Sequence, residues 1–78
     1  MLKKIINQLK ILNISFNTEV GKKNKKYFFE INNIKYSILI DKLRNNKIIE
    51  LIINDCNIYN NDKEMSFKLE EIYNKLKS

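Results

Sequence analysis

Apolar and polar residues alternate along most of the segment 27–54, and two Asn-Asn pairs interrupt this alternation. A period of two residues is typical of strands that bury one face. Asparagine tolerates the left-handed backbone of tight hairpin turns, so Asn32-Asn33 and Asn45-Asn46 each predict a reversal between antiparallel strands. The segment therefore predicts an antiparallel meander, against which the rest of the chain has to pack.

Turns centred on these two pairs also predict which residues face each other. The first turn pairs apolar residues throughout, namely Tyr27 with Ile38, Phe29 with Tyr36 and Ile31 with Ile34. The second turn pairs Ile38 with Ile53, Ile40 with Leu51 and Lys42 with Ile49. Both hairpins place the same face of the middle strand in the core, and a slip by one residue would expose that face to water.

The segments on either side of the meander complete the predicted fold. Leu2, Ile5, Ile6, Leu9 and Leu12 recur at helical spacing, and Asn13 can end this helix. A first strand follows, and its pairing across the polar connection 21–26 sets Val20 opposite Tyr27, Thr18 opposite Phe29 and Phe16 opposite Ile31. Asn61 is a candidate N-cap for a second helix, with Glu64 three residues later and an apolar stripe formed by Met65, Leu69, Ile72, Tyr73 and Leu76.

The sequence thus predicts one α+β domain over residues 1–78, with the order α-β-β-β-β-α. Its four-stranded antiparallel meander carries two helices packed mainly on one face. We expect Tyr36, Ile38, Ile40, Leu51 and Ile53 to be buried against Ile5, Ile6, Leu9, Leu69, Ile72 and Leu76. The turn-rich segment 55–62 is expected to connect the sheet to the second helix, with Ile58 and Tyr59 folding back on the core.

Composition weakens one obvious functional argument. The chain carries a net charge of +6, but its 14 Ile, 13 Asn and 14 Lys residues, with no Ala and one Arg, are what an AT-rich genome would encode. Lysine in place of arginine fits codon supply better than phosphate recognition, which favours the bidentate fork of arginine. The net charge alone is therefore not an argument for nucleic-acid binding.

The predicted register collects apolar residues on the face of the sheet that points away from the helices. These residues are Phe28, Leu39, Leu43, Ile48 and Ile52. A contiguous apolar patch of this kind marks an interaction site on a soluble protein. We interpret it as a protein interface, either with a partner or between two copies of this chain, with the last strand of the meander as a free edge that could pair with a second copy.

A second candidate surface is the lysine-rich connection before the meander. Lys22, Lys23, Lys25 and Lys26 lie beside Tyr27 and Phe28 and could contact nucleic acid or an acidic partner. The alternative interpretation is a solvated turn that is rich in lysine because of codon bias. The sequence leaves both interpretations open.

No residue pattern predicts catalysis, a cofactor or a metal. Asp41 and Glu50 are expected to face each other on the outer face, but no third acidic residue is spaced to complete a metal site with them. Cys56 is the only cysteine and the chain has no histidine, so a Cys-His nucleophile pair cannot form and Cys56 is interpreted as a small buried hydrophobic residue. We therefore expect a protein without enzymatic activity.

The function that remains is a non-catalytic protein-binding module acting as a small inhibitor or adaptor. Its expected partner is another protein or a nucleoprotein complex, and a homodimer is a further arrangement. Size and composition fit an anti-defence (anti-CRISPR-like) protein of a phage or plasmid from an AT-rich genome, which is an argument by analogy. The alternative is a small basic domain that binds RNA or another nucleic acid.

The order of helix, strands and helix resembles that of the double-stranded RNA-binding domain. That family has three strands between its helices and a lysine cluster at the start of the second helix. Here the second helix includes Met65-Ser-Phe-Lys-Leu-Glu-Glu-Ile72 and has no such cluster at its start, so the chain is not assigned to that family. No apolar run is long enough for a membrane span or the core of a signal peptide, and we expect a cytoplasmic protein.

Overall fold

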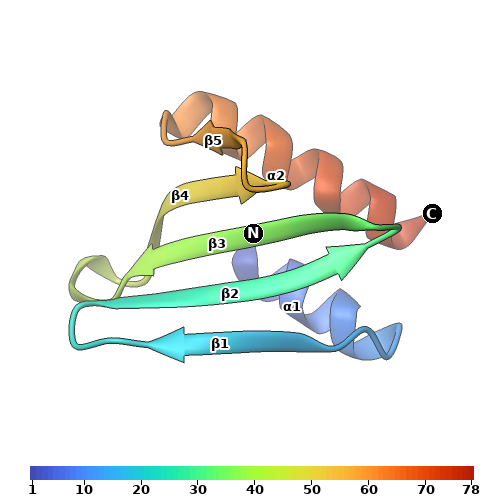
Figure 1. Ribbon diagram of the computed structural model, residues 1–78, viewed down its shortest axis with the longest axis horizontal. Coiled ribbons are helices and arrows are strands. Elements are labelled where there is room, and N and C mark those ends of the chain that lie inside the picture. The colour runs from blue at the N-terminus through green and yellow to red at the C-terminus, as the bar shows by residue number, and fades with distance from the viewer.

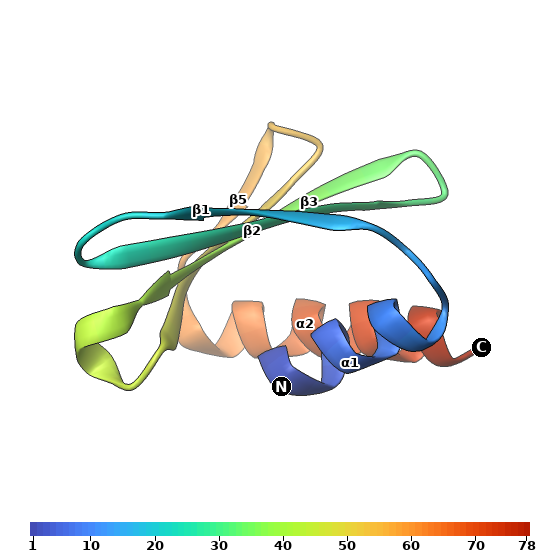
Figure 2. The same ribbon diagram turned by 90° about the horizontal axis from the view of Figure 1, so that it is seen from below.

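Two helices and one antiparallel sheet form two layers in the computed structural model, which describes residues 1–78 (Figure 1). The elements in chain order are α1 (Leu2–Ile11), β1 (Phe16–Val20), β2 (Asn24–Ile31), β3 (Ile34–Asp41), the short 3-10 helix η1 (Lys42–Arg44), β4 (Lys47–Ile53), β5 (Asn57–Tyr59) and α2 (Asp62–Lys77). Both helices lie against the same face of the sheet (Figure 2). This confirms the predicted α+β class and the two-layer arrangement. No helix is both long enough and apolar enough to cross a membrane.

The end of α1 is set by Asn13, as predicted. Asn13 has a left-handed backbone with φ of 57°, and its N–H donates to the carbonyl of Lys10 at 3.1 Å. The next N–H, from Ile14, donates to the carbonyl of Leu9 at 2.9 Å. These two bonds form a Schellman motif, which satisfies carbonyls at the helix end and turns the chain toward the sheet.

The hairpin between β2 and β3 has the predicted register. Asn32 and Asn33 have φ of 51° and 67°, the left-handed pair that a two-residue hairpin turn requires. Tyr27 lies opposite Ile38, Phe29 opposite Tyr36 and Ile31 opposite Ile34. The turn consists of these two residues alone, so the position of the turn determines which residues of β2 and β3 pair.

The predicted registers of the two neighbouring hairpins are each wrong by two residues. Ile38 pairs with Leu51 and Tyr36 with Ile53, because the β3–β4 connection is wider than an Asn-Asn turn and includes η1. On the other side of the sheet Thr18 pairs with Tyr27 and Val20 with Lys25, because β2 begins at Asn24 and the connection is short. A shift of two residues keeps side chains on their predicted faces wherever the pairing is regular.

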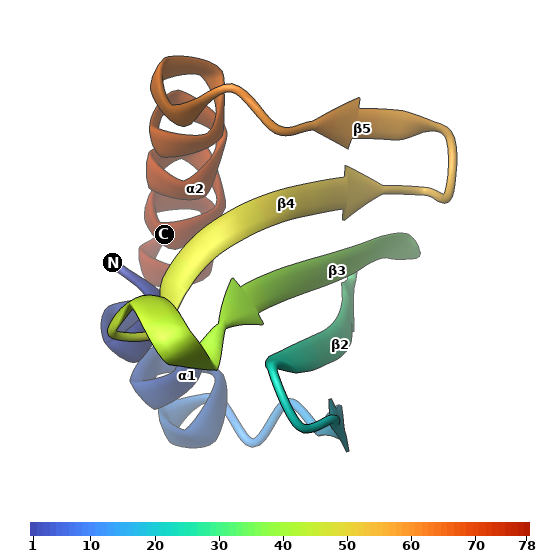
Figure 3. The same ribbon diagram turned by 90° about the vertical axis from the view of Figure 1, so that its left-hand side faces the viewer.

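A register irregularity between Leu39 and Ile40 moves Ile48 from its predicted place on the outer face to the core side. Leu39 pairs with Glu50, but Ile40 pairs with Ile48, so β4 carries one extra residue at this point. Such a β-bulge bends the strand and increases its twist. Figure 3 shows β4 curving toward the helices, which brings η1 close to the helical layer.

The sheet has five strands where the sequence predicted four. Asn54 and Asp55, with φ of 55° and 62°, form a third turn of left-handed residues, and the N–H of Cys56 donates to the carbonyl of Ile53 at 3.4 Å. The chain then returns as β5, which pairs with β4 through Leu51–Tyr59, Ile52–Ile58 and Ile53–Asn57. The sheet order is β1-β2-β3-β4-β5, so β4 is not an edge strand over 51–53.

The helix α2 begins where the sequence predicted. The side chain of Asn61 accepts hydrogen bonds from the backbone N–H groups of Lys63, at 3.0 Å, and Glu64, at 3.3 Å. This satisfies two of the four donors that a helix start leaves unpaired. The buried residues of α2 that follow the cap, Met65, Leu69, Ile72 and Leu76, belong to its predicted apolar stripe.

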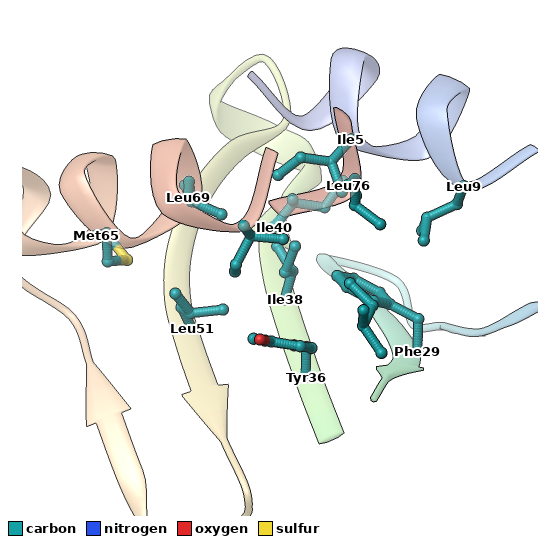
Figure 4. Close-up of a cluster of buried hydrophobic side chains, with 12 residues drawn as sticks. Ile5, Leu9, Phe29, Tyr36, Ile38, Ile40, Leu51, Met65, Leu69 and Leu76 are labelled. Carbon is teal, nitrogen blue, oxygen red and sulfur yellow. The ribbon is translucent and has the colours of Figure 1, made fainter. Parts of the chain in front are cut away.

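The core lies between the two layers (Figure 4). Its twelve buried side chains are all apolar or aromatic: Ile5, Leu9, Phe29, Ile31, Tyr36, Ile38, Ile40, Leu51, Met65, Leu69, Ile72 and Leu76. Ile6 and Ile53, also expected in the core, are half-buried and pack against it. The predicted inward face of the sheet is thereby confirmed.

Candidate protein interface on the outer face of the sheet

The face of the sheet opposite the helices is uncovered (Figure 2), and a row of side chains crosses it from strand to strand. The register places Phe28 of β2 beside Ser37 of β3, Ser37 beside Ile52 of β4, and Ile52 beside Ile58 of β5. We call these four residues the outer row. Three of its four members are apolar, and the most exposed is Ile58, at 57%.

Ser37 leaves a hollow within the outer row. A depression of about 290 Å³ is lined by Phe28, Ser37 and Ile52, and Glu30, Lys35 and Asp55 also border it. The small serine side chain between two large apolar neighbours accounts for the space. An apolar anchor side chain of a partner protein could fill such a depression, which is the arrangement that concentrates binding energy in protein interfaces.

Charged residues flank the outer row on both sides. In the adjacent row of the sheet, Leu39 lies between Lys26 and Glu50, and on the other side Glu30 faces Lys35. The ammonium group of Lys26 lies 5.8 Å from the centre of the Phe28 ring. An apolar centre with a mixed-charge rim is the usual anatomy of a protein-protein interface.

The structure brings together three of the five predicted interface residues. Phe28, Leu39 and Ile52 lie on the outer face and are half-buried by their neighbours. Ile48 does not belong to this face, because the bulge in β4 pairs it with Ile40 and packs it against the core. Leu43 was expected on the same face, but it lies in η1 and is 72% exposed.

The predicted pair of facing carboxylates is also wrong. Asp41 lies opposite Lys47, and Glu50 lies opposite Leu39. Asp41 instead caps η1: its side chain accepts from the N–H of Leu43 at 3.0 Å and lies 3.6 Å from the guanidinium of Arg44. Its role is to hold the turn that shifts the β3–β4 register.

The four lysines expected in one loop are divided among three places. Lys22 and Lys23 lie in the β1–β2 turn, whereas Lys25 and Lys26 belong to β2. Alternation along the strand turns Lys25 toward the helix side, where its ammonium lies 4.9 Å from the Tyr27 ring centre, and turns Lys26 to the outer face. The strand geometry therefore separates the predicted cluster.

Other placements also differ from expectation or were missed. Cys56 was interpreted as buried, but it is exposed in the turn before β5. Ile58 was expected to fold back on the core, but it is 57% exposed on the outer face, where the hairpin turn signalled by Asn54-Asp55 places it. Phe67, 63% exposed on α2, lies outside the apolar stripe of that helix and was missed as well.

No protein-family model, curated protein or solved structure matches this chain.

Proposed function

We propose that this chain is a non-catalytic protein-binding module that docks another protein against the outer row. The observation that carries the proposal is the continuous line of Phe28, Ser37, Ile52 and Ile58 across four strands that no helix covers. An apolar line of this kind on a small domain gains free energy when a partner removes it from water. The rim of Lys26, Glu50 and their neighbours would then fix the orientation of the partner.

The chemistry of the outer row favours a protein over a nucleic acid as the partner. Its exposed apolar groups are mainly aliphatic, and the one aromatic ring, that of Phe28, is half-buried with Lys26 above it. Single-stranded nucleic acid needs free ring faces on which bases can stack. Nucleic-acid binding therefore remains the second candidate, supported by the net charge of +6.

The proposal extends to a role as a small inhibitor or adaptor. A single domain with one large uncovered face suits a protein that acts by occupying the surface of another. Its size and codon-biased composition further support an anti-CRISPR-like role in a phage or plasmid of an AT-rich genome, with a protein or nucleoprotein complex as the target. This last step is an analogy from composition.

The test compares association by the native chain and by the double variant Leu39→Lys, Ile52→Lys. Both side chains point away from the helices, so we expect the variant to keep its fold and to lose partner capture from a lysate of the source cell. Sedimentation of the purified protein reports self-association in the same samples. Nuclease treatment of the lysate leaves capture unchanged if a protein surface is the target.

The matched control is the double variant Leu43→Lys, Phe67→Lys. Both residues are highly exposed, but they lie in η1 and α2 rather than on the outer face of the sheet, so this variant adds the same charge without touching the proposed interface. We expect this control to capture partner as the native chain does. Equal capture by both double variants, or capture that disappears after nuclease treatment, would overturn the proposal.

A further inference from the structure

A groove lies on the helix side of the molecule, between α1, the first half of α2 and the end of the sheet that carries η1. Its volume is about 1070 Å³. The bend of β4 toward the helices, visible in Figure 3, brings the residues after η1 to this groove. The outer row lies on the opposite face of the sheet, so an occupant of the groove and a partner on the outer row would not compete.

Lysines from four separate elements converge on the rim of the groove. They are Lys3 and Lys10 of α1, Lys25 of β2, Lys42 of η1 and Lys47 of β4, and Asp62 is the only acidic residue in the lining. Codon bias explains a high number of lysines, but it does not explain why lysines distant in sequence gather at one place. The groove therefore has a local excess of positive charge.

Three of these lysines form neither an ion pair nor a side-chain hydrogen bond within the chain. Lys47 lies 3.4 Å from the carboxylate of Asp62, and Lys42 donates from Nζ to the carbonyl of Gly21 at 3.0 Å. Lys3, Lys10 and Lys25 form no ion pair. No carboxylate of the chain neutralises their ammonium groups, although that of Lys25 lies over the Tyr27 ring, so all three can meet the carboxylates of a ligand.

The floor of the groove is aliphatic. Leu2, Ile6 and Ile48 are half-buried there, and Ile40, Met65 and Leu69 lie below them as part of the core. An apolar floor beneath a charged rim suits a ligand that has apolar and anionic groups side by side. A purely ionic ligand would leave the floor in contact with water.

We propose that this groove binds an acidic peptide segment whose aliphatic side chains rest on the floor while its carboxylates meet Lys3, Lys10 and Lys25. The argument is charge complementarity together with the apolar floor. A nucleic acid fits less well, because no arginine lines the groove and its single aromatic ring, Tyr27, has the Lys25 ammonium 4.9 Å above it. Bases would find no free ring to stack on.

The test measures fluorescence anisotropy of three labelled probes with the full chain at about 20 mM salt, where screening is weak. The probes are a short peptide with alternating glutamate and leucine, a peptide of equal length with serine in place of leucine, and oligo-dT. We expect the glutamate-leucine peptide to bind at least about tenfold more tightly than either of the others. Replacing Lys3, Lys10 and Lys25 with Gln should weaken its binding about tenfold.

The control variant replaces Lys63, Lys75 and Lys77 with Gln, which removes the same charge from outside both the groove and the outer face of the sheet. We expect this variant to change the affinity for the glutamate-leucine peptide less than about twofold. Equal affinity for the two peptides, tighter binding of oligo-dT, equal losses in both variants, or no binding of any probe would each overturn the proposal. None of these outcomes depends on the outer row, so the proposed function is tested separately.

Discussion

Asn54 and Lys35 exchange two hydrogen bonds at the end of the β3–β4 ladder. The backbone N–H of Asn54 donates to the carbonyl of Lys35 at 2.8 Å, and the side-chain oxygen of Asn54 accepts from the N–H of Lys35 at 3.0 Å. Asn54 also has φ of 55° in the turn that leads to β5. One residue thus extends the ladder and reverses the chain toward the strand that carries Ile58.

We expect Asn54→Ala to lower the free energy of unfolding by about 1 to 2 kcal/mol. Alanine pays a steric cost in the left-handed region and cannot supply the lost acceptor for Lys35. Asn54→Gly should cost less, because glycine adopts this backbone freely and loses only the side-chain bond. Urea denaturation of the two variants measures the difference, and an alanine variant as stable as the glycine variant would contradict the role assigned to the backbone.

The β2–β3 hairpin shows what the sequence could predict about this fold. Asn32 and Asn33 are the only two residues between the paired positions Ile31 and Ile34, so the position of this turn determines the whole register of the two strands. The helix ends at Asn13 and Asn61 were predictable for the same reason, since each depends on a local side-chain or backbone property. The sequence was sufficient to predict a turn or a helix end wherever the properties of one or two asparagine residues determine the local backbone.

The β3–β4 hairpin shows what the sequence could not predict. Asn45 and Asn46 do have left-handed backbones, but Asp41 caps a 3-10 turn before them, and the width of this connection depends on that capped turn. The bulge in β4 bends this strand toward the helices, and no glycine or other local signal in the strand marks its place. Ile48 was consequently assigned to the wrong face.

The two candidate sites also differ in how far they could be predicted from the sequence. The apolar members Phe28, Leu39 and Ile52 of the outer face could be predicted, because strand parity survives a shift of two residues. The basic groove could not, because Lys3, Lys25 and Lys47 meet only after the helices pack on the sheet. The lysines that are adjacent in sequence are instead separated by the alternation of β2.

Ile38 at the centre of the sheet should be one of the most sensitive positions of the core. It is fully buried between the strands and the helices (Figure 4), so Ile38→Ala should lower the free energy of unfolding by about 2 to 5 kcal/mol. A loss of this size approaches the total stability of a small domain. Leu43→Ala, at an exposed position of η1, is the matched control and should change stability by less than about 0.5 kcal/mol. Chemical denaturation measures both, and similar losses at the two positions would contradict the assigned core.

Lys25 and Lys26 provide a test of the nucleic-acid alternative, because β2 turns them to opposite faces of the sheet. A single RNA strand can then contact only one of them. Changing both to Gln should therefore reduce the slope of log affinity against log salt for generic single-stranded RNA by about 0.7, the value for one phosphate contact.

The comparison variant changes Lys22 and Lys23 to Gln. These two lysines lie in the turn between β1 and β2, where an RNA strand on either face of the sheet can reach both, so the slope should fall by about 1.4. A reduction of about 1.4 in the first variant would mean that the RNA reaches both faces. Binding to RNA that cannot be detected even at low salt would remove nucleic acid from the candidate partners.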